Sequence, residues 1–425
     1  MVFKNDPPPI NPANKPQFLQ PQIFNLSSGI PVYGLKVGKQ DLVRIDFIFD
    51  AGSVFAENPI LAEAVNTLSD SGTSFHSSEM IAEELDFYGA YLEKYSGFHK
   101  SKIVLYTLNK YIDQTLCILS EIIYQAIFPE NEIDVFIQNR YQNYLINRKK
   151  TEIISNELFT RCLFGPNHPY GKNPTEADFK LINSEMITEF HKKHYIEAKF
   201  KIIISGKVES IHYDIIEKYF GKAGINVTQK PELLFTIDPA KKLKHFEHID
   251  NTVQSSVKIG KRTINKKHPD FFNLNITTIL LGGYFGSRLM KNIREDKGYT
   301  YGIYASNTSL IESGFFSVSA ETGKQVYSKA IDEIYKELKS LRTKKVPVEE
   351  LVRVKNWISG NMLKAFDGPF ALLETLSSTL DYEMDFGYYE RYFDAIKSIT
   401  PDLILESAET YLHEDAMYEI VAGSK

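Results

Sequence analysis

Cysteine and tryptophan are almost absent from this 425-residue sequence, which contains two cysteines and one tryptophan. A chain of this length with only Cys117 and Cys162 does not depend on a disulfide framework. Both cysteines lie among apolar neighbours, which predicts two buried free thiols. No uninterrupted apolar stretch reaches the roughly 18 residues that a membrane-spanning helix needs, so we expect no membrane partner.

An excess of basic residues is also missing. The 49 lysines and arginines are outnumbered by 54 aspartates and glutamates, which gives a formal net charge of -5. Nucleic-acid binding calls for a concentrated basic face, so the composition argues against a nucleic-acid partner. Residues 1–12 contain three consecutive prolines and no apolar signal-peptide core. We therefore expect a cytoplasmic protein, or a periplasmic one whose export signal has been removed.

Several enzyme signatures are missing as well. The sequence has neither the G-x-S-x-G nucleophile elbow nor the G-x-x-x-x-G-K-[ST] phosphate loop. A glycine-rich run at 282–286 follows a predicted helix at 273–281 instead of a strand, which argues against a dinucleotide site.

The sequence does contain an internal repeat. A proline-led start of a long amphipathic segment at Phe128 recurs at Val346, 346 − 128 = 218 positions later. A short apolar strand that ends at Gly206 recurs with its end at Gly423, an offset of 423 − 206 = 217. The length exceeds that of one ordinary core, so we predict two similar domains.

Hydropathy patterns set the expected fold class. Residues 43–49 alternate between apolar and polar, which predicts a half-buried strand, and amphipathic helical patterns follow in each half. We predict an α+β fold in which each domain packs helices on a mixed, largely antiparallel sheet. Prolines and weak periodicity place a linker at 229–241, between an N-terminal domain, 1–228, and a C-terminal domain, 242–425.

A helix expected at 61–73 carries a family resemblance. Ala62, Leu68, Gly72 and Thr73 match the frame A-H-F-L-E-H-M-x-F-x-G-T, which contains the H-x-x-E-H motif of the inverted zincins. In this respect the sequence resembles the pitrilysin/insulinase metallopeptidase family, which includes mitochondrial processing peptidase.

The metal-binding positions of that frame are replaced by Glu63, Asn66 and Thr67. The motif works because two imidazoles one helical turn apart hold zinc and a glutamate takes a proton from the zinc-bound water. An amide and a hydroxyl cannot take these roles. The family's third ligand is a glutamate about 75 residues further on, but residues 135–151 contain no Asp, Glu, His or Cys. We predict that this chain has no metal site and no cofactor.

Other histidines offer weaker candidates. His191 and His194 have ligand-like spacing, but the repeat retains only His413 there, so a surface helix is favoured over a metal site. His168 belongs to an H-P-Y-G loop that matches the family and is favoured as a loop anchor over a catalytic residue.

The sharpest match covers residues 282–302. It resembles the family signature G-x-x-x-S-R-L-[FY]-x-x-x-R-E-x-x-G-[LY]-x-Y, with Met290 as a departure. The resemblance implies that Arg294 and Tyr301 reach toward a zinc site on an opposing domain, where a guanidinium and a phenol can hold a peptide backbone and stabilise an oxyanion. Without this signature, a surface arginine and a core tyrosine would be the simpler interpretation. Arg288 and Glu295 are expected to be structural.

The resemblance extends from about residue 22 to residue 425. It implies a zinc-free, substrate-binding subunit of a heterodimeric zinc metallopeptidase that acts on short or unfolded peptides. The expected partner is a homologous subunit with H-x-x-E-H and zinc, to which this chain, inactive alone, supplies Arg294 and Tyr301 in trans. The alternative is a purely structural homologue, like the family members that are scaffolds in respiratory complexes. Retention of Arg294 and Tyr301 favours the first hypothesis.

Overall fold

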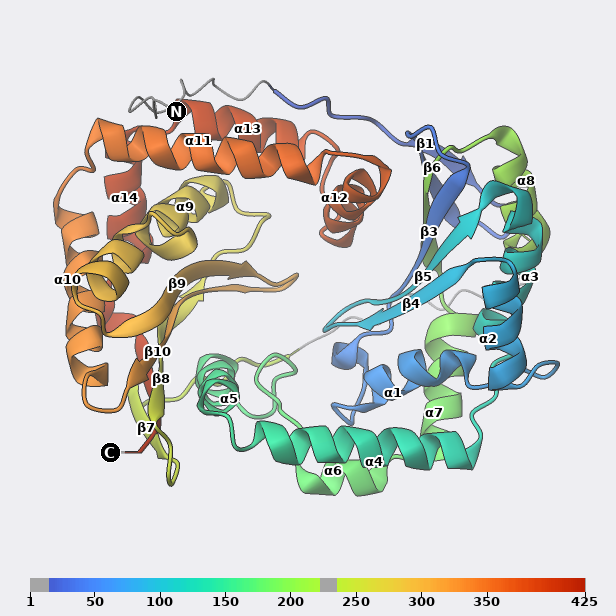
Figure 1. The fold of residues 1–425 in the computed structure, drawn as a ribbon, viewed down its shortest axis with the longest axis horizontal. Helices are drawn as coiled ribbons and strands as arrows, with labels where there is room; N and C mark the ends of the chain where they lie inside the picture. Colours follow the sequence, from blue (N-terminus) through green and yellow to red (C-terminus); the bar gives the residue numbers. More distant parts are fainter. Residues whose placement is uncertain (1–14, 222–234, 425) are drawn as a thin grey trace, which may run out of the picture.

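The computed structural model describes residues 15–221 and 235–424. Two β-sheets stand on opposite sides of the molecule, and helices lie along the remaining sides (Figure 1). The predicted linker, 229–241, lies partly outside the described residues, and its described part, 235–241, forms neither helix nor strand. The domain limits remain a prediction.

The first sheet has the strand order β1-β2-β6-β3-β5-β4. Only β2 and β6 pair in parallel. The strands are β1 (Gln22–Asn25), β2 (Pro31–Lys36), β3 (Leu42–Phe49), β4 (Tyr91–Ser96), β5 (Ser101–Leu108) and β6 (Phe200–Gly206).

The second sheet repeats this arrangement with the order β7-β11-β8-β10-β9, which corresponds strand for strand to β2-β6-β3-β5-β4. Its parallel pair is β7 with β11. The strands are β7 (Lys244–His248), β8 (Gln254–Thr263), β9 (Thr300–Ser309), β10 (Gly314–Gly323) and β11 (Tyr418–Gly423). The predicted α+β class with two similar mixed sheets is confirmed.

The helices follow the same repeat. The long helices α4 (Glu130–Asn147) and α11 (Val348–Ala365) both have 18 residues, and their starts are 348 − 130 = 218 positions apart. No helix among the described residues is both long and apolar enough to span a membrane. The others are α1 (Leu61–Thr67), α2 (Ser78–Phe87), α3 (Ile112–Tyr124), α5 (Thr151–Phe164), α6 (Glu176–Leu181), α7 (Ser184–His191), α8 (Ser210–Phe220), α9 (Phe271–Thr278), α10 (Tyr327–Thr343), α12 (Pro369–Asp381), α13 (Tyr388–Ser398) and α14 (Pro401–Tyr411).

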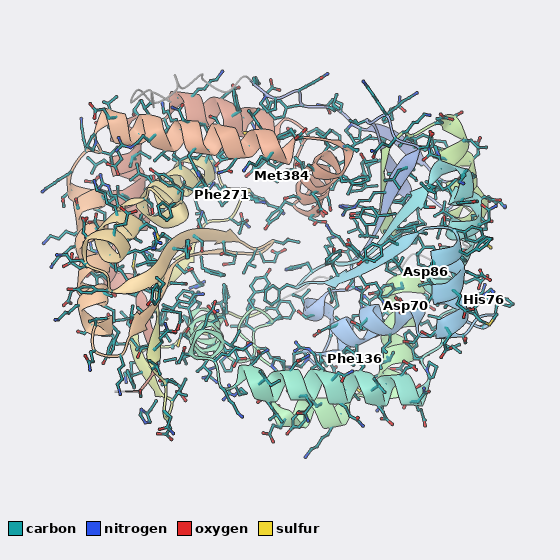
Figure 2. The ribbon with its side chains drawn as sticks, viewed as in Figure 1. Asp70, His76, Asp86, Phe136, Phe271 and Met384 are labelled. Atoms are coloured by element: carbon teal, nitrogen blue, oxygen red, sulfur yellow. The ribbon has the colours of Figure 1, made fainter. Side chains whose placement is uncertain are left out.

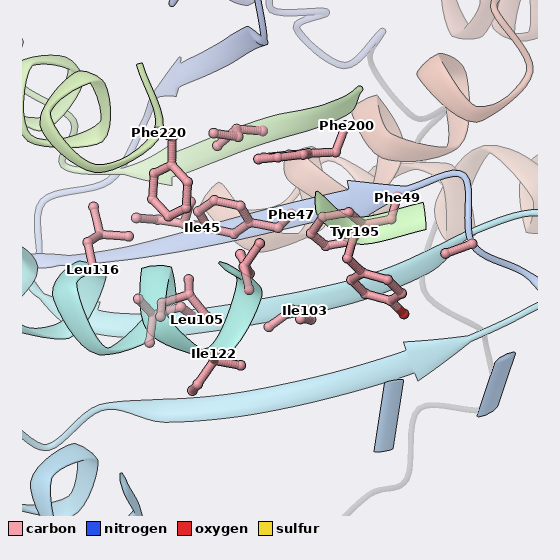
Figure 3. Packing of buried hydrophobic residues seen from close by; sticks show 14 of the residues in the cluster. Ile45, Phe47, Phe49, Ile103, Leu105, Leu116, Ile122, Tyr195, Phe200 and Phe220 are labelled. Atoms are coloured by element: carbon pink, nitrogen blue, oxygen red, sulfur yellow. The ribbon is translucent and has the colours of Figure 1, made fainter. Parts of the chain in front are cut away.

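The core of the first half lies between its sheet and helices α3, α7 and α8 (Figure 3). Phe220, on α8, packs against Phe47 of β3 with ring centroids 4.8 Å apart. Phe49 packs against Phe200 of β6 at 4.9 Å, and all four rings are buried. Aromatic pairs at these separations add to the stabilisation that burial alone provides.

Each half contributes one helix that packs on the sheet of the other half. Helix α5, from the first half, covers the second sheet with Leu158, Phe159 and Cys162 packed near Tyr418 and Ile420. Its counterpart α12 starts 369 − 151 = 218 residues later and covers the face of the first sheet opposite α3 and α8, toward the middle of the molecule (Figure 1). There its leucines meet Leu35, Ile48 and Ile203. Cys162 is therefore buried as predicted, whereas Cys117 is only half-buried.

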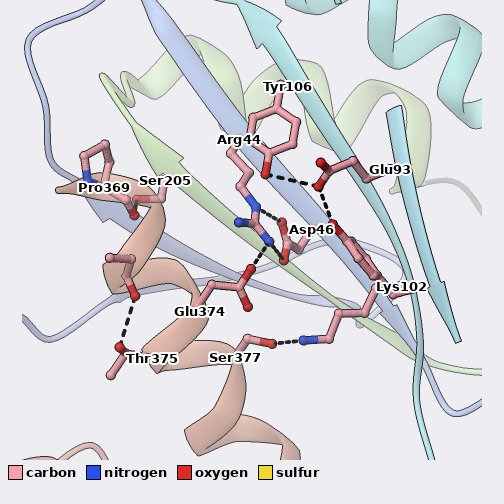
Figure 4. A network of polar contacts seen from close by, with 12 residues as sticks. Arg44, Asp46, Glu93, Lys102, Tyr106, Ser205, Pro369, Glu374, Thr375 and Ser377 are labelled. Atoms are coloured by element: carbon pink, nitrogen blue, oxygen red, sulfur yellow. Dashed lines mark hydrogen bonds and ion pairs between the residues drawn. The ribbon is translucent and has the colours of Figure 1, made fainter. Parts of the chain in front are cut away.

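This exchange corrects the expectation of a half-buried strand at 43–49. Because α12 covers the second face of β3, Arg44 and Asp46 are buried together with their apolar neighbours. The guanidinium of Arg44 donates through Nε and Nη2 to the Asp46 carboxylate at 2.7 and 2.9 Å (Figure 4). It also donates to Glu374, on α12, at 2.5 Å. The charge network therefore holds the exchanged helix to the strand.

Candidate functional site

The degenerate zinc motif lies on α1 and forms an ion pair in place of a metal site. Arg140, on α4, donates through Nε to Oε2 of Glu63 at 2.9 Å, and their side chains are 31% and 41% exposed. Figure 2 labels Asp70, just after α1, and Phe136, on α4, and shows the two helices along the same side of the molecule. The helix expected to carry a third metal ligand thus supplies a cation.

At the other two motif positions, Asn66 has a structural role and Thr67 faces solvent. Asn66 is buried, and its Oδ1 accepts a hydrogen bond from the hydroxyl of Tyr195 at 3.1 Å. The side chain of Thr67 is exposed. Nowhere in the described ranges do three or more His, Cys, Asp or Glu side chains form a group that could hold a metal. A guanidinium facing α1 would also repel a metal cation, so these residues do not fit zinc.

Arg294 and Tyr301 line one open cavity of about 780 Å³ at the edge of the second sheet. Arg294 lies on the π-helical segment η6 (Met290–Asp296), and Tyr301 is the second residue of β9. Gly298 joins the two elements with φ of +66°, a conformation that favours glycine. The structure thus brings together the two residues that the signature singled out.

A β-bulge directs Tyr301 outward. The register between β9 and β10 shifts between Ala320 and Thr322, which leaves Tyr301 out of regular pairing. The hydroxyl of Thr300 accepts from the Gly302 N–H at 3.1 Å and donates to the Glu321 carbonyl at 2.6 Å. Bulges commonly reorient a side chain next to a functional site. Tyr301 is 90% exposed, so its phenol is presented to solvent and does not belong to a core.

The guanidinium of Arg294 lies over an aromatic ring. Its guanidinium carbon lies 4.7 Å from the centroid of Phe285, within the range of a cation–π contact. Among the residues that the structure describes, no carboxylate pairs with Arg294, so its guanidinium keeps its hydrogen-bonding capacity for a ligand. Phe285 itself is largely exposed.

The first half also reaches the wall of this cavity. Glu321, on β10, lines the cavity, and burial raises the pKa of its carboxyl group. Thr151, the first residue of α5, donates to Oε2 of Glu321 at 3.0 Å. Sequence reasoning missed Thr151, Glu321 and Phe285, because Thr151 and Glu321 meet only through the exchange of α5. The nearest signal was Phe285, which lies inside the matched signature.

Two expectations for the residues around Arg294 have different outcomes. Arg288 is structural as expected, since its Nε and Nη2 donate to the Glu350 carboxylate at 2.7 and 2.9 Å. Glu295 instead lies exposed at the cavity that Arg294 lines.

The histidines outside the signature are not brought together as ligands. His168 is buried, and its Nδ1 accepts from the N–H of Tyr170 at 3.1 Å, as a loop anchor would. The predicted surface helix at His191 and His194 is wrong, because both side chains are buried where α7 changes into the π-helical segment η4 (Lys192–Ile196). His194 contacts the Asp50 carbonyl at 2.9 Å through Nδ1.

Comparisons with known proteins agree with this picture. Residues 182–357 match the family model described as the peptidase M16 inactive domain. An "uncharacterized zinc protease" of Rickettsia felis is 27% identical over 404 residues, which cover 91% of this chain and 93% of the relative. The mitochondrial-processing peptidase subunit beta of Saccharomyces cerevisiae is 20% identical over 425 aligned positions, covering 94% of this chain and 90% of that protein.

The fold itself also has a solved counterpart. The crystal structure of a peptidase M16 inactive domain from Pseudomonas fluorescens superposes with a TM-score of 0.86 and 19% identity, covering 96% of this chain and 99% of that one. The fold with its two repeated sheets is therefore one that is already known from a crystal structure. Residues 182–357 therefore match the peptidase M16 inactive-type domain, and the chain is similar over most of its length to proteins named zinc protease and mitochondrial-processing peptidase subunit beta.

Proposed function

We propose that this chain is the substrate-binding subunit of a two-subunit zinc peptidase that acts on short or unfolded peptides. The observation that carries the proposal is the shared cavity of Arg294 and Tyr301, which remains open while the motif on α1 is replaced by an ion pair. Relatives named zinc proteases, and a yeast relative named as a subunit, support a role in proteolysis within a complex.

The chemistry follows from the two side chains. Negative charge develops on the carbonyl oxygen of a peptide bond during its hydrolysis, and the phenol of Tyr301 can donate a hydrogen bond to that oxygen. The guanidinium of Arg294 can donate to a neighbouring backbone carbonyl and fix the position of the peptide. The metal that activates water would belong to the partner, an H-x-x-E-H homologue of similar fold.

The test is a complex reconstituted from this chain and its H-x-x-E-H homologue, assayed with a fluorogenic peptide. Tyr301→Phe removes only the phenolic hydroxyl from an exposed side chain, so folding, assembly and the zinc content of the complex should not change. Turnover should fall by about 10² to 10³, the usual loss for one oxyanion donor. Arg294→Ala should raise KM as well, because it removes a charged contact with the substrate backbone.

Tyr304→Phe is the matched control. Tyr304 is also exposed and also lies on β9, but it does not line the cavity. Its replacement should leave turnover within about twofold. Full turnover in both Tyr301→Phe and Arg294→Ala would refute the proposal and favour a structural subunit.

A further inference from the structure

A second cavity, of about 450 Å³, opens beside the degenerate motif. Its walls come from the loop 53–59 that follows β3, the turn after β4, helix α4, and the loop 167–174. Arg140 lines it, and Arg140 also pairs with Glu63, the residue at the first metal-ligand position. The cavity therefore begins beside the place where the H-x-x-E-H frame would hold its metal.

Two cations and one acidic residue line this cavity. Arg140 uses its Nε for Glu63, and across the described residues its two terminal Nη groups form no hydrogen bond. Lys172 donates through Nζ to the backbone carbonyl of Glu57 at 2.5 Å, which directs the ammonium into the same cavity. The Glu57 side chain is itself exposed. The wall thus offers a free guanidinium edge and a second positive charge.

The other walls are apolar and rigid. Phe98, in the turn after β4, is 41% exposed and packs edge-on against Tyr170 with centroids 5.0 Å apart. Phe55 packs against the buried ring of His194 at 5.3 Å. Pro59, Pro169 and Pro174 add to the apolar surface with Val54, Ala56 and Phe235, and Ser53 and Asn167 also line the cavity. Rings fixed from behind and loops stiffened by proline form a preorganised apolar surface, which binds with little loss of conformational entropy.

We infer that this cavity binds the free C-terminal carboxylate of a peptide whose last side chain is apolar. A guanidinium presents a planar fork that matches a carboxylate bidentately, and an ammonium at the same end adds charge. The apolar walls would take the last side chain, which loses contact with water there. The ligand class rests on the proposed function, but the inference concerns binding alone and requires neither zinc nor a partner.

The test uses the isolated chain and two labelled peptides of one sequence that ends in phenylalanine, one with a free carboxylate and one with a C-terminal amide. Fluorescence anisotropy should show at least about tenfold tighter binding of the free acid, because the amide cannot accept the bidentate pair. Arg140→Gln and Lys172→Gln should each remove most of this preference. The free acid should also lose affinity as salt is raised.

Arg148→Gln is the matched control, because this substitution removes the same charge at the end of the same helix. Arg148 is the C-cap of α4 and does not line this cavity. It should keep the preference for the free acid, and thermal unfolding should show that all variants are folded. Equal binding of acid and amide, no binding of either peptide, or an equal loss in Arg148→Gln would overturn the inference. A preserved preference alongside full turnover in both Tyr301→Phe and Arg294→Ala would refute only the proposed function.

Discussion

Acid should destabilise this protein through His191, a histidine buried in the first half. The side chain is 3% exposed, and its ring stacks on Tyr195 with centroids 5.3 Å apart. Burial lowers the pKa of His191 from 6.5 to about 4, although a hydrogen bond with the backbone of Ile123 partly opposes this shift. The folded chain therefore keeps His191 neutral at pH values where the unfolded chain protonates it.

The sign and size of the effect follow from linkage. Between pH 6.5 and pH 4 the unfolded state binds more protons, so the free energy of unfolding rises with pH. The contribution of neutral His191 to the free energy of unfolding is fully present above pH 6.5 and is lost as the pH falls toward 4. The two pKa values correspond to a total loss of about 3 kcal/mol, of which about 2 kcal/mol is reached by pH 5.

Urea unfolding at pH 7.5 and pH 5, followed by circular dichroism, measures this loss. In His191→Phe the ring is kept but cannot be protonated, so the difference in unfolding free energy between the two pH values should shrink by about 2 kcal/mol. A remainder should persist, because burial also lowers the pKa of His168, His194 and His212. His248→Phe, at an exposed position, is the control. A pH dependence in His191→Phe equal to that of the parent would refute the reasoning.

Three further changes test the fold and the missing metal site. Asp46→Ala removes the carboxylate that accepts from Nε and Nη2 of Arg44 and leaves Glu374 as the remaining carboxylate, so it should lower the free energy of unfolding by about 1.5 to 3 kcal/mol. Asp41→Ala, at an exposed position that pairs with Lys207, should lower it by less than about 1 kcal/mol in the same denaturation. Phe159→Ala removes a fully buried ring between α5 and the second sheet. Calorimetry should show that the free energy of unfolding falls by about 3 to 5 kcal/mol. A fall of less than about 1 kcal/mol would mean that α5 does not pack tightly on that sheet. The triple variant Glu63→His, Asn66→Glu and Thr67→His restores H-x-x-E-H but should bind no zinc that survives dialysis. The third ligand is absent, and Arg140 faces the motif. Elemental analysis showing one zinc per chain would contradict this prediction.

The sequence predicted those features that depend on local order along the chain. The 218-residue repeat is visible because the proline-led starts before α4 and α11 are local patterns, and the structure shows both helices with that offset. The motif substitutions at Asn66 and Thr67 are equally local. Arg294 and Tyr301 were singled out by a signature that includes the turn glycine between their two elements.

What the sequence did not reveal depends on long-range packing. An amphipathic pattern shows that a helix has an apolar face, but not which sheet covers that face, so the exchange of α5 and α12 was missed. For the same reason Arg44 and Asp46 were predicted to face solvent. The Glu63–Arg140 pair joins residues 77 positions apart, and neither residue type indicates its partner. His191 and His194 were misplaced because a π-helical turn changes which side chains point inward.

The exchange of helices has a consequence for biosynthesis. The first sheet is complete once β6 has been made, but the helix that covers the apolar face around Ile48 and Ile203 starts only at Pro369. At roughly 5 to 20 residues per second, the ribosome needs roughly 10 to 35 seconds to reach the end of α12. During this interval the nascent first half exposes an apolar sheet face, which is the kind of surface that chaperones bind. The packing of the first half is therefore completed only after α12 of the second half has been synthesised.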